Sequence, residues 1–340
     1  MVQGYRFAPI LAGLLAAFAG CARWPASGFA PTAPTPVGAM AIALARSGAM
    51  GASAAPPVYV ALFTHIEDNT PTGTIGSAAS RANYLNIRAR LLEMTALVER
   101  YGVRWSLQPD WKILLAAQQY EDAATMASTG GVNLFRHLRD RGVVIDPHSH
   151  EGSGYNYPDV AYLLETLGVG GSTVVGGHIW DPTLPQFAEW DRFRVTVAGR
   201  RYSTARWRGD ILMGSATPNH VNDPIVSGVW RPRDRYAYWE DDPAGNIAAI
   251  GAYKSSVDGV NELVDAYRTG RADPSCMLTA SHPISPSAFL APGGVAAIES
   301  TVIRPYVDLR SEGVVELTDF TTLVEVWRTR FGAVACTMRE

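Results

Sequence analysis

The chain of 340 residues has almost no excess charge of either sign and only three cysteines. Its 29 Lys+Arg residues against 32 Asp+Glu residues give a formal net charge of −3. This balance excludes the basic surface typical of nucleic-acid-binding proteins, so we expect no nucleic-acid partner. Hydrophobic residues make up 47% of the chain, which excludes disorder of the whole protein. Such a length can bury one large α/β core or two smaller ones.

The first apolar run, residues 7–20, is too short to span a bilayer, which takes about 20 residues. It follows Arg6 and ends in small residues, a pattern typical of a secretory signal peptide. The segment 18–21, Phe-Ala-Gly-Cys, resembles a bacterial lipobox, whose cysteine is acylated. We therefore predict a signal peptide over 1–21 and export to the periplasm or outer envelope. Membrane contact would be only through a lipid on Cys21, unless this is an ordinary signal with an incidental cysteine.

Residues 22–57 are mainly Ala, Pro, Gly and Ser, which predicts a flexible linker. The two further cysteines, Cys276 and Cys336, are not in metal-ligand spacing, so a thiolate metal site is excluded. They either pair in an oxidising compartment or stay as buried thiols, and sequence separation leaves both alternatives open.

From residue 58 to residue 335 strand and helix patterns alternate, which predicts parallel strands in an α/β fold. We expect a (β/α) barrel or a doubly wound sheet, with residues 191–250 as a β-rich insertion over its mouth. The expected strands are 58–63, 103–107, 143–145, 172–175, 276–280 and 314–317. In both folds the catalytic and binding residues lie at the carboxyl ends of the strands.

Five of the seven histidines fall at these predicted strand ends, together with an acidic pair. They are His65, His148, His150, His178 and His282, and the acidic pair is Glu67 and Asp68. Two imidazoles and a carboxylate, with one position left open for water, are the ligands of a catalytic zinc-type site.

We predict one divalent metal ion, zinc as the first choice, bound by Asp68, His148 and His150. The two histidines are two residues apart and so point to the same side of an extended segment. Glu67 is the predicted general base and His282 the predicted general acid. The alternatives are a solvent-facing acid at Glu67 and a histidine bonded within the rim at His282.

Four further side chains are candidates for contacting the substrate. His65 and His178 are assigned to the substrate because a fourth protein ligand would close the metal site. Trp105 and Trp180 are candidates for stacking on a sugar, with packing in the core as the alternative.

The order of these motifs resembles the polysaccharide deacetylase (NodB-like) superfamily, from about residue 58 to residue 330. Glu67-Asp68 corresponds to the family's acidic pair, and His148-Ser149 to the start of its histidine motif. The second histidine comes early, at His150, and the family's Arg-x-Pro motif has no match. The resemblance implies a divergent member with a distorted, often seven-stranded barrel. It also implies metal-dependent removal of acetyl groups from N-acetylated sugars, with a glycan of the cell envelope as the partner.

Two other interpretations stay open. The segment 144–150 also resembles the Asp-x-His-x-His opening of amidohydrolase barrels, although about 190 residues follow it. A non-catalytic envelope lipoprotein that binds carbohydrate would keep the barrel without turnover. The glycan, the native metal and the oligomeric state are not readable from the sequence.

Overall fold

A computed structural model describes residues 55–340 except 179, 182, 184–188, 214–222 and 252. These residues belong to one compact unit, which begins at Ser53. The predicted signal peptide, Cys21 and nearly all of the predicted linker lie outside the described residues. Among the helices of the described part, none combines the length and the apolar character that a bilayer span requires.

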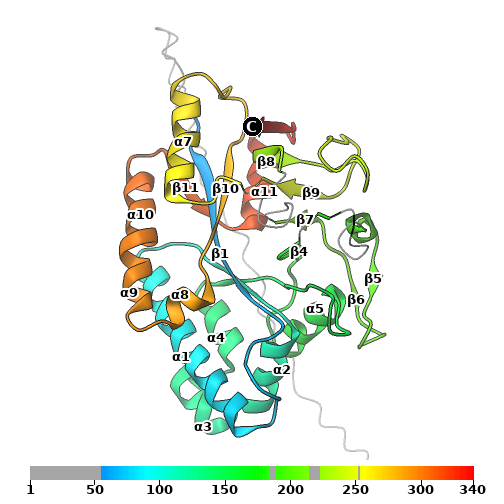
Figure 1. Ribbon diagram of the computed structural model, residues 1–340, viewed down its shortest axis with the longest axis vertical. Coiled ribbons are helices and arrows are strands. Elements are labelled where there is room, and N and C mark those ends of the chain that lie inside the picture. The colour runs from blue at the N-terminus through cyan, green and yellow to red at the C-terminus, as the bar shows by residue number, and fades with distance from the viewer. Residues whose placement is uncertain (1–54, 179, 182, 184–188, 214–222, 252) are drawn as a thin grey trace, which may run out of the picture. The chain divides into compact units, whose positions relative to one another are not determined.

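A parallel sheet is built around β1 (Val58–Ile66), which lies near the centre of Figure 1. It pairs with β10 (Thr279–Pro283), its first half also pairs with β11 (Val315–Thr318), and its last half with β2 (Ser106–Pro109). β3 (Val144–Ile145) pairs with β2. Since all these strands are parallel, their carboxyl ends lie on one side of the sheet.

A second, mixed sheet has the order β12-β8-β9-β7-β4. The strands β4 (Val174–Val175), β7 (Ile211–Leu212) and β9 (Ala248–Ile250) are parallel, whereas β8 (Ile225–Trp230) pairs antiparallel with both β9 and β12 (Cys336–Arg339). The region predicted as an insertion therefore supplies strands to a sheet, besides the hairpin of β5 (Val197–Ala198) and β6 (Arg206–Trp207).

The two sheets meet at two places. His148 forms a parallel bridge with Gly176, just beyond the ends of β3 and β4. At the other junction Ser227 Oγ donates to the carbonyl of Thr279, and Thr279 Oγ1 accepts from the backbone N–H of Gly228. The predicted mixed α/β class is confirmed, and a closed barrel stays a prediction.

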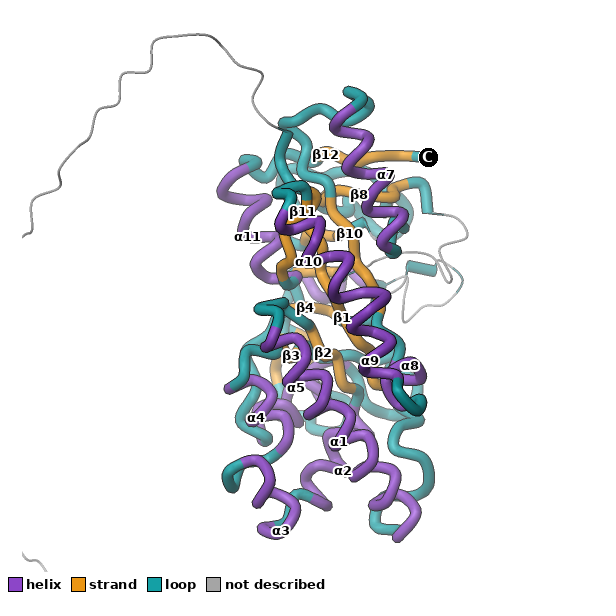
Figure 2. Tube along the Cα trace, turned by 90° about the vertical axis from the view of Figure 1, so that its left-hand side faces the viewer, coloured by secondary structure: helices purple, strands orange, loops and turns teal. Residues whose placement is uncertain are grey.

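Helices flank the strands, as Figure 2 shows. Most begin at a side-chain cap: Ser77 caps α1, Asp110 caps α2 and Asn156 caps α5. The helices are α1 (Ala78–Arg100), α2 (Trp111–Tyr120), α3 (Ala123–Met126), α4 (Leu134–Asp140), α5 (Tyr157–Thr166), α7 (Val257–Arg268), α8 (Pro286–Leu290), α9 (Gly294–Ile298), α10 (Arg304–Ser311) and α11 (Phe320–Arg330).

β1 is apolar throughout because both of its faces are buried. Val60 and Leu62 face the main core with α1, while Tyr59 and Phe63 face a second core with α11. Alternate positions of β1 thus point to different layers, and this alternation decides which polar residues at its end can meet.

Candidate metal centre

Three neighbouring strands carry polar side chains at alternate positions beyond or near their ends. His65 and Glu67 end β1, Gln108 and Asp110 end β2, and His148 follows β3. His65 pairs with Gln108 in the sheet, and the backbone N–H of His148 donates to the carbonyl of Pro109 at 3.3 Å. Since residues two apart along a strand share a face, these side chains converge at one edge.

His65, Glu67 and His148 form a group of potential metal ligands. One ligand atom from each lies within 4.8 Å of the other two. Glu67 Oε2 lies 3.7 Å from His148 Nε2, and the ring centroids of His65 and His148 are 4.5 Å apart. Ligands that bind one zinc ion at about 2.1 Å lie some 3–4 Å from one another, so small shifts suffice to bring these three to one ion.

The environment of the two imidazoles fits a cation. His148 is wholly buried, and neither of its ring nitrogens has a hydrogen-bond partner among the described residues; the same holds for His65 Nε2. Burial lowers the pKa of both histidines well below 6.5, and their proximity to each other and to His150 lowers that of His65 further. A neutral imidazole offers a lone pair, so the donor set suits a divalent metal ion.

Asp68 and His150, the other two predicted ligands, lie beside this group of three. Asp68 accepts a hydrogen bond from Ser153 Oγ at 3.1 Å. His150 is more exposed, with its Nδ1 3.6 Å from Glu67 Oε2. Their role as ligands stays a prediction, while His65, assigned to the substrate from the sequence, lies among the potential ligands.

Glu67, the predicted base, is within reach of both neighbouring histidines. Burial raises the pKa of its carboxyl group, His150 opposes this, and the charges of Asp110 and Asp68 add to it. The raised pKa favours proton uptake, whereas the closeness of Oε2 to His148 Nε2 equally suits metal binding.

His282, the predicted acid, contacts a different layer. Its Nδ1 lies 2.9 Å from the hydroxyl oxygen of Tyr306, a buried residue of α10, and burial lowers the pKa of His282 to about 4. Its partner in the sheet is Leu62, whose side chain lies in the core with Tyr306. The structure does not bring His282 into the group of three, and its role as an acid stays a prediction.

The predicted aromatic contacts separate into buried and half-buried residues. Trp105 is fully buried and donates its indole N–H to Thr64 Oγ1 at 3.0 Å, so it has no exposed face for a sugar and packs in the core. Trp180 is half-buried and stacks on Tyr238 with ring centroids 5.3 Å apart. His178 is buried, and the centroid of its ring lies 6.4 Å from the centroid of the Tyr238 ring. The substrate roles of Trp180 and His178 stay predictions.

Asp110 and Gln108 were missed by the sequence analysis. Asp110 is the first acid after the predicted strand 103–107, so the strand-end rule could have found it. Burial raises the pKa of its carboxyl group to about 7. The amide of Gln108 lies against His65 and, on the other side, 3.5 Å from Asp146 Oδ2.

Two features hold the histidine segment in place. Gly177 has a φ of +69°, and a Cβ there would lie 2.3 Å from His148 Nε2, so only glycine allows this close approach. Glu151, with a φ of 56°, accepts hydrogen bonds from Arg192 at 2.8 Å and Arg200 at 2.9 Å. The buried Glu151 carboxylate thus fastens the segment after His150 to the arginine-rich region 191–250.

Solved structures with a similar fold include two deacetylases. A probable polysaccharide deacetylase from Pseudomonas aeruginosa PAO1 is 11% identical, with a TM-score of 0.48 over 80% of this chain and 91% of that one. A putative polysaccharide deacetylase from Mycobacterium smegmatis is 9% identical, with a TM-score of 0.48 over 84% and 94%.

An allantoinase is 10% identical, with a TM-score of 0.47 over 80% of this chain and 90% of that one. No protein-family model matches the chain, and no curated protein matches it by sequence. At such identities and scores these likenesses identify neither a substrate nor a site in this chain.

Proposed function

We propose that the protein is a metal-dependent hydrolase of amide bonds, which removes acetyl groups from N-acetylated sugars of a glycan. The observation that carries the proposal is the group of His65, Glu67 and His148 at the carboxyl ends of parallel strands. Among the described residues both ring nitrogens of the buried His148 and Nε2 of His65 have no hydrogen-bond partner, which supports a metal ion there. The N-acetylated sugar is supported by the resemblance of the motifs to the deacetylase superfamily.

In this proposal the ion is held by His65, Glu67 and His148, with zinc as the first choice. When bound, such an ion supplies Lewis-acid polarisation of the amide carbonyl. His150, more exposed and 3.6 Å from Glu67, is placed to take a proton from the attacking water and pass it to the leaving amine. Gly177 and Glu151 keep the segment that carries both histidines in place.

The assignment made from the sequence competes with this one: Asp68, His148 and His150 as ligands, Glu67 as base and His282 as acid. Glu67→Gln separates the two. If Glu67 is a ligand, the variant binds the metal much more weakly than wild type. If Glu67 is only the base, the variant keeps its metal and loses turnover, and Asp68→Asn is the variant that loses metal.

The function is tested by metal analysis and by acetate release from N-acetylglucosamine oligomers. We expect about one divalent ion per chain, and loss of both the ion and acetate release in His148→Ala. His137→Ala, on α4 outside the group of three, is the matched control and should behave as wild type. Sugar binding without acetate release would instead support a carbohydrate-binding protein, and two ions with a preference for cyclic amides would support an amidohydrolase.

We also propose that the protein is exported and anchored by a lipid on Cys21. Support comes from the signal-like run 7–20 and from the disulfide between Cys276 and Cys336, since disulfides persist mainly in oxidising compartments. Cysteine at position 21 would be required for incorporation of a radioactive fatty acid in a bacterial host, and Cys21→Ala should abolish it. Labelling that survives this substitution would contradict the anchor.

A further inference from the structure

The carboxylate of Asp110 contacts three parts of the candidate metal centre. Its Oδ1 accepts the backbone N–H of Trp111 at 2.6 Å, which caps α2. Its Oδ2 lies 3.4 Å from His148 Nδ1, and the backbone N–H of His150 lies near the carboxylate. Asp110 is only 1% exposed, so these contacts exclude bulk water.

The two ring nitrogens of His148 face different partners. Nδ1 faces the Asp110 carboxylate at 3.4 Å, whereas Nε2 faces Glu67 Oε2 at 3.7 Å. Neither contact has the geometry of a hydrogen bond, so a small shift of the ring or of the carboxylate is needed to form one. In a neutral imidazole one nitrogen carries the proton, and the neighbouring group decides which one. In its ionised form the Asp110 carboxylate can only accept a hydrogen bond, so it favours the proton on Nδ1 and leaves the lone pair on Nε2.

We propose that Asp110 is a positioning residue that holds His148 in the Nδ1–H tautomer, with Nε2 presented to the same point as Glu67 and His65. This inference rests on the metal centre of the proposed function. Carboxylates in this position orient ligating histidines and increase their basicity. The competing explanation is that Asp110 does no more than cap α2, as Asp122 caps α3 through the N–H of Thr125.

Asp110→Asn separates the two explanations without removing the cap, because asparagine caps helices as well as aspartate. The amide oxygen must stay on the N–H of Trp111, so the new NH₂ group replaces Oδ2 and faces His148 Nδ1. An NH₂ group only donates, and Nδ1 must then accept. The proton moves to Nε2, and the lone pair for the ion is lost.

The experiment measures Zn²⁺ binding to the full-length protein by titration calorimetry for wild type, Asp110→Asn, Asp122→Asn and His148→Ala. We expect Asp110→Asn to bind about 10–100-fold more weakly than wild type, the cost usual for losing such an orienting group. Asp122→Asn should bind as wild type. In the metal-free proteins, ¹⁵N NMR should find His148 as the Nδ1–H tautomer in wild type and as the Nε2–H tautomer in Asp110→Asn.

The outcomes distinguish this inference from the proposed function. If wild type binds Zn²⁺, His148→Ala does not, and Asp110→Asn binds as wild type with an unchanged tautomer, the inference is overturned and the metal centre stands. If wild type binds no Zn²⁺, the proposed function fails and the inference with it. Asp110→Ser, which also keeps a cap, should weaken binding as well, and wild-type affinity in both Asp110 variants would contradict the role.

Discussion

Two strand-end histidines, His65 and His282, show how one position along a strand decides the surroundings of a side chain. His282 pairs with Leu62, whose side chain faces the helices, and its Nδ1 meets Tyr306. His65 lies an odd number of residues from Leu62 and points to the opposite face, towards His148. The strand-end rule found both residues, but it does not state which face each occupies.

The burial of His282 makes the stability of the protein depend on pH. Burial lowers its pKa to about 4, against 6.5 when exposed. The unfolded chain binds a proton at this residue below about pH 6.5 and the folded chain only below about pH 4, so stability falls as the pH drops through this window. His282→Gln should lessen this fall by more than about 1 kcal/mol, measured by urea unfolding at pH 7 and pH 4.5. If the free energies of unfolding of wild type and His282→Gln fell by the same amount between pH 7 and pH 4.5, this prediction would be wrong.

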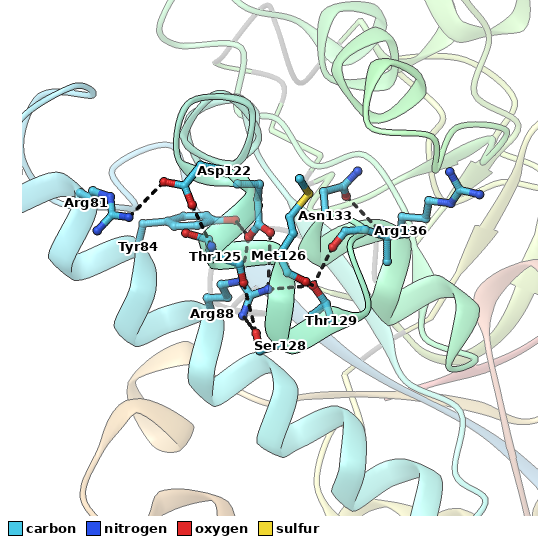
Figure 3. A network of polar contacts seen from close by, with 12 residues as sticks. Arg81, Tyr84, Arg88, Asp122, Thr125, Met126, Ser128, Thr129, Asn133 and Arg136 are labelled. Atoms are coloured by element: carbon cyan, nitrogen blue, oxygen red, sulfur yellow. Dashed lines mark hydrogen bonds and ion pairs between the residues drawn. The ribbon is translucent and has the colours of Figure 1, made fainter.

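At the scale of elements, α1 is joined to the end of α2 by a buried ion pair between Arg88 and Glu121. Figure 3 shows Arg88 beside Ser128 and Thr129. Arg88 Nε donates to Glu121 Oε1 at 2.8 Å, and the hydroxyl of Tyr84 donates to the same oxygen at 2.6 Å. The other two guanidinium nitrogens of Arg88 donate to Ser128 Oγ and Thr129 Oγ1. These hydrogen bonds link α1 to the end of α2 and to the turn after α3.

Removing one partner of this pair should destabilise the protein strongly. Glu121→Ala leaves the Arg88 guanidinium buried without a counter-charge, and we expect a loss of about 3–5 kcal/mol in the free energy of unfolding. The matched control is Glu93→Ala, which breaks the exposed pair with Arg90 and should cost less than about 1 kcal/mol. If the two substitutions lowered the free energy of unfolding equally in urea, the buried pair would contribute no more to stability than the exposed one.

Elements with a clear hydrophobic period were predictable. The apolar residues that recur every three or four positions in α1, among them Tyr84, Leu91 and Met94, are buried, as this spacing predicts for one face of a helix. β1 was likewise expected from its continuous apolar run. The strand β4 lies within the expected strand 172–175. The strands β7 and β9 have only two or three residues each, too few to show a period, and their pairing depends on partners far away in the chain.

At the scale of the whole molecule, Cys276 and Cys336 form a disulfide. It joins the segment before β10, in the parallel sheet, to the start of β12, in the mixed sheet. Of the two alternatives that the sequence left open, pairing is the one observed, because the fold places the two Cα atoms 5.1 Å apart.

Because the disulfide closes a separation of 60 residues, removing it should lower the free energy of unfolding by about 4 kcal/mol through the entropy of the unfolded chain. The double variant Cys276→Ser/Cys336→Ser and reduced wild type should unfold at the same, lower urea concentration. If oxidised wild type were no more stable than the double variant or reduced wild type, the disulfide would not stabilise the fold.

The sequence by itself determined the alternation of strands and helices, the α/β class, and the positions at strand ends where polar side chains gather, because hydrophobic periodicity and strand ends are local properties. The tertiary structure alone decided which of these side chains meet. It brought His65 to Glu67 and His148, added Asp110, placed His282 against Tyr306 and paired the two cysteines. These outcomes depend on strand register and on contacts between residues far apart in the chain, which no local pattern contains.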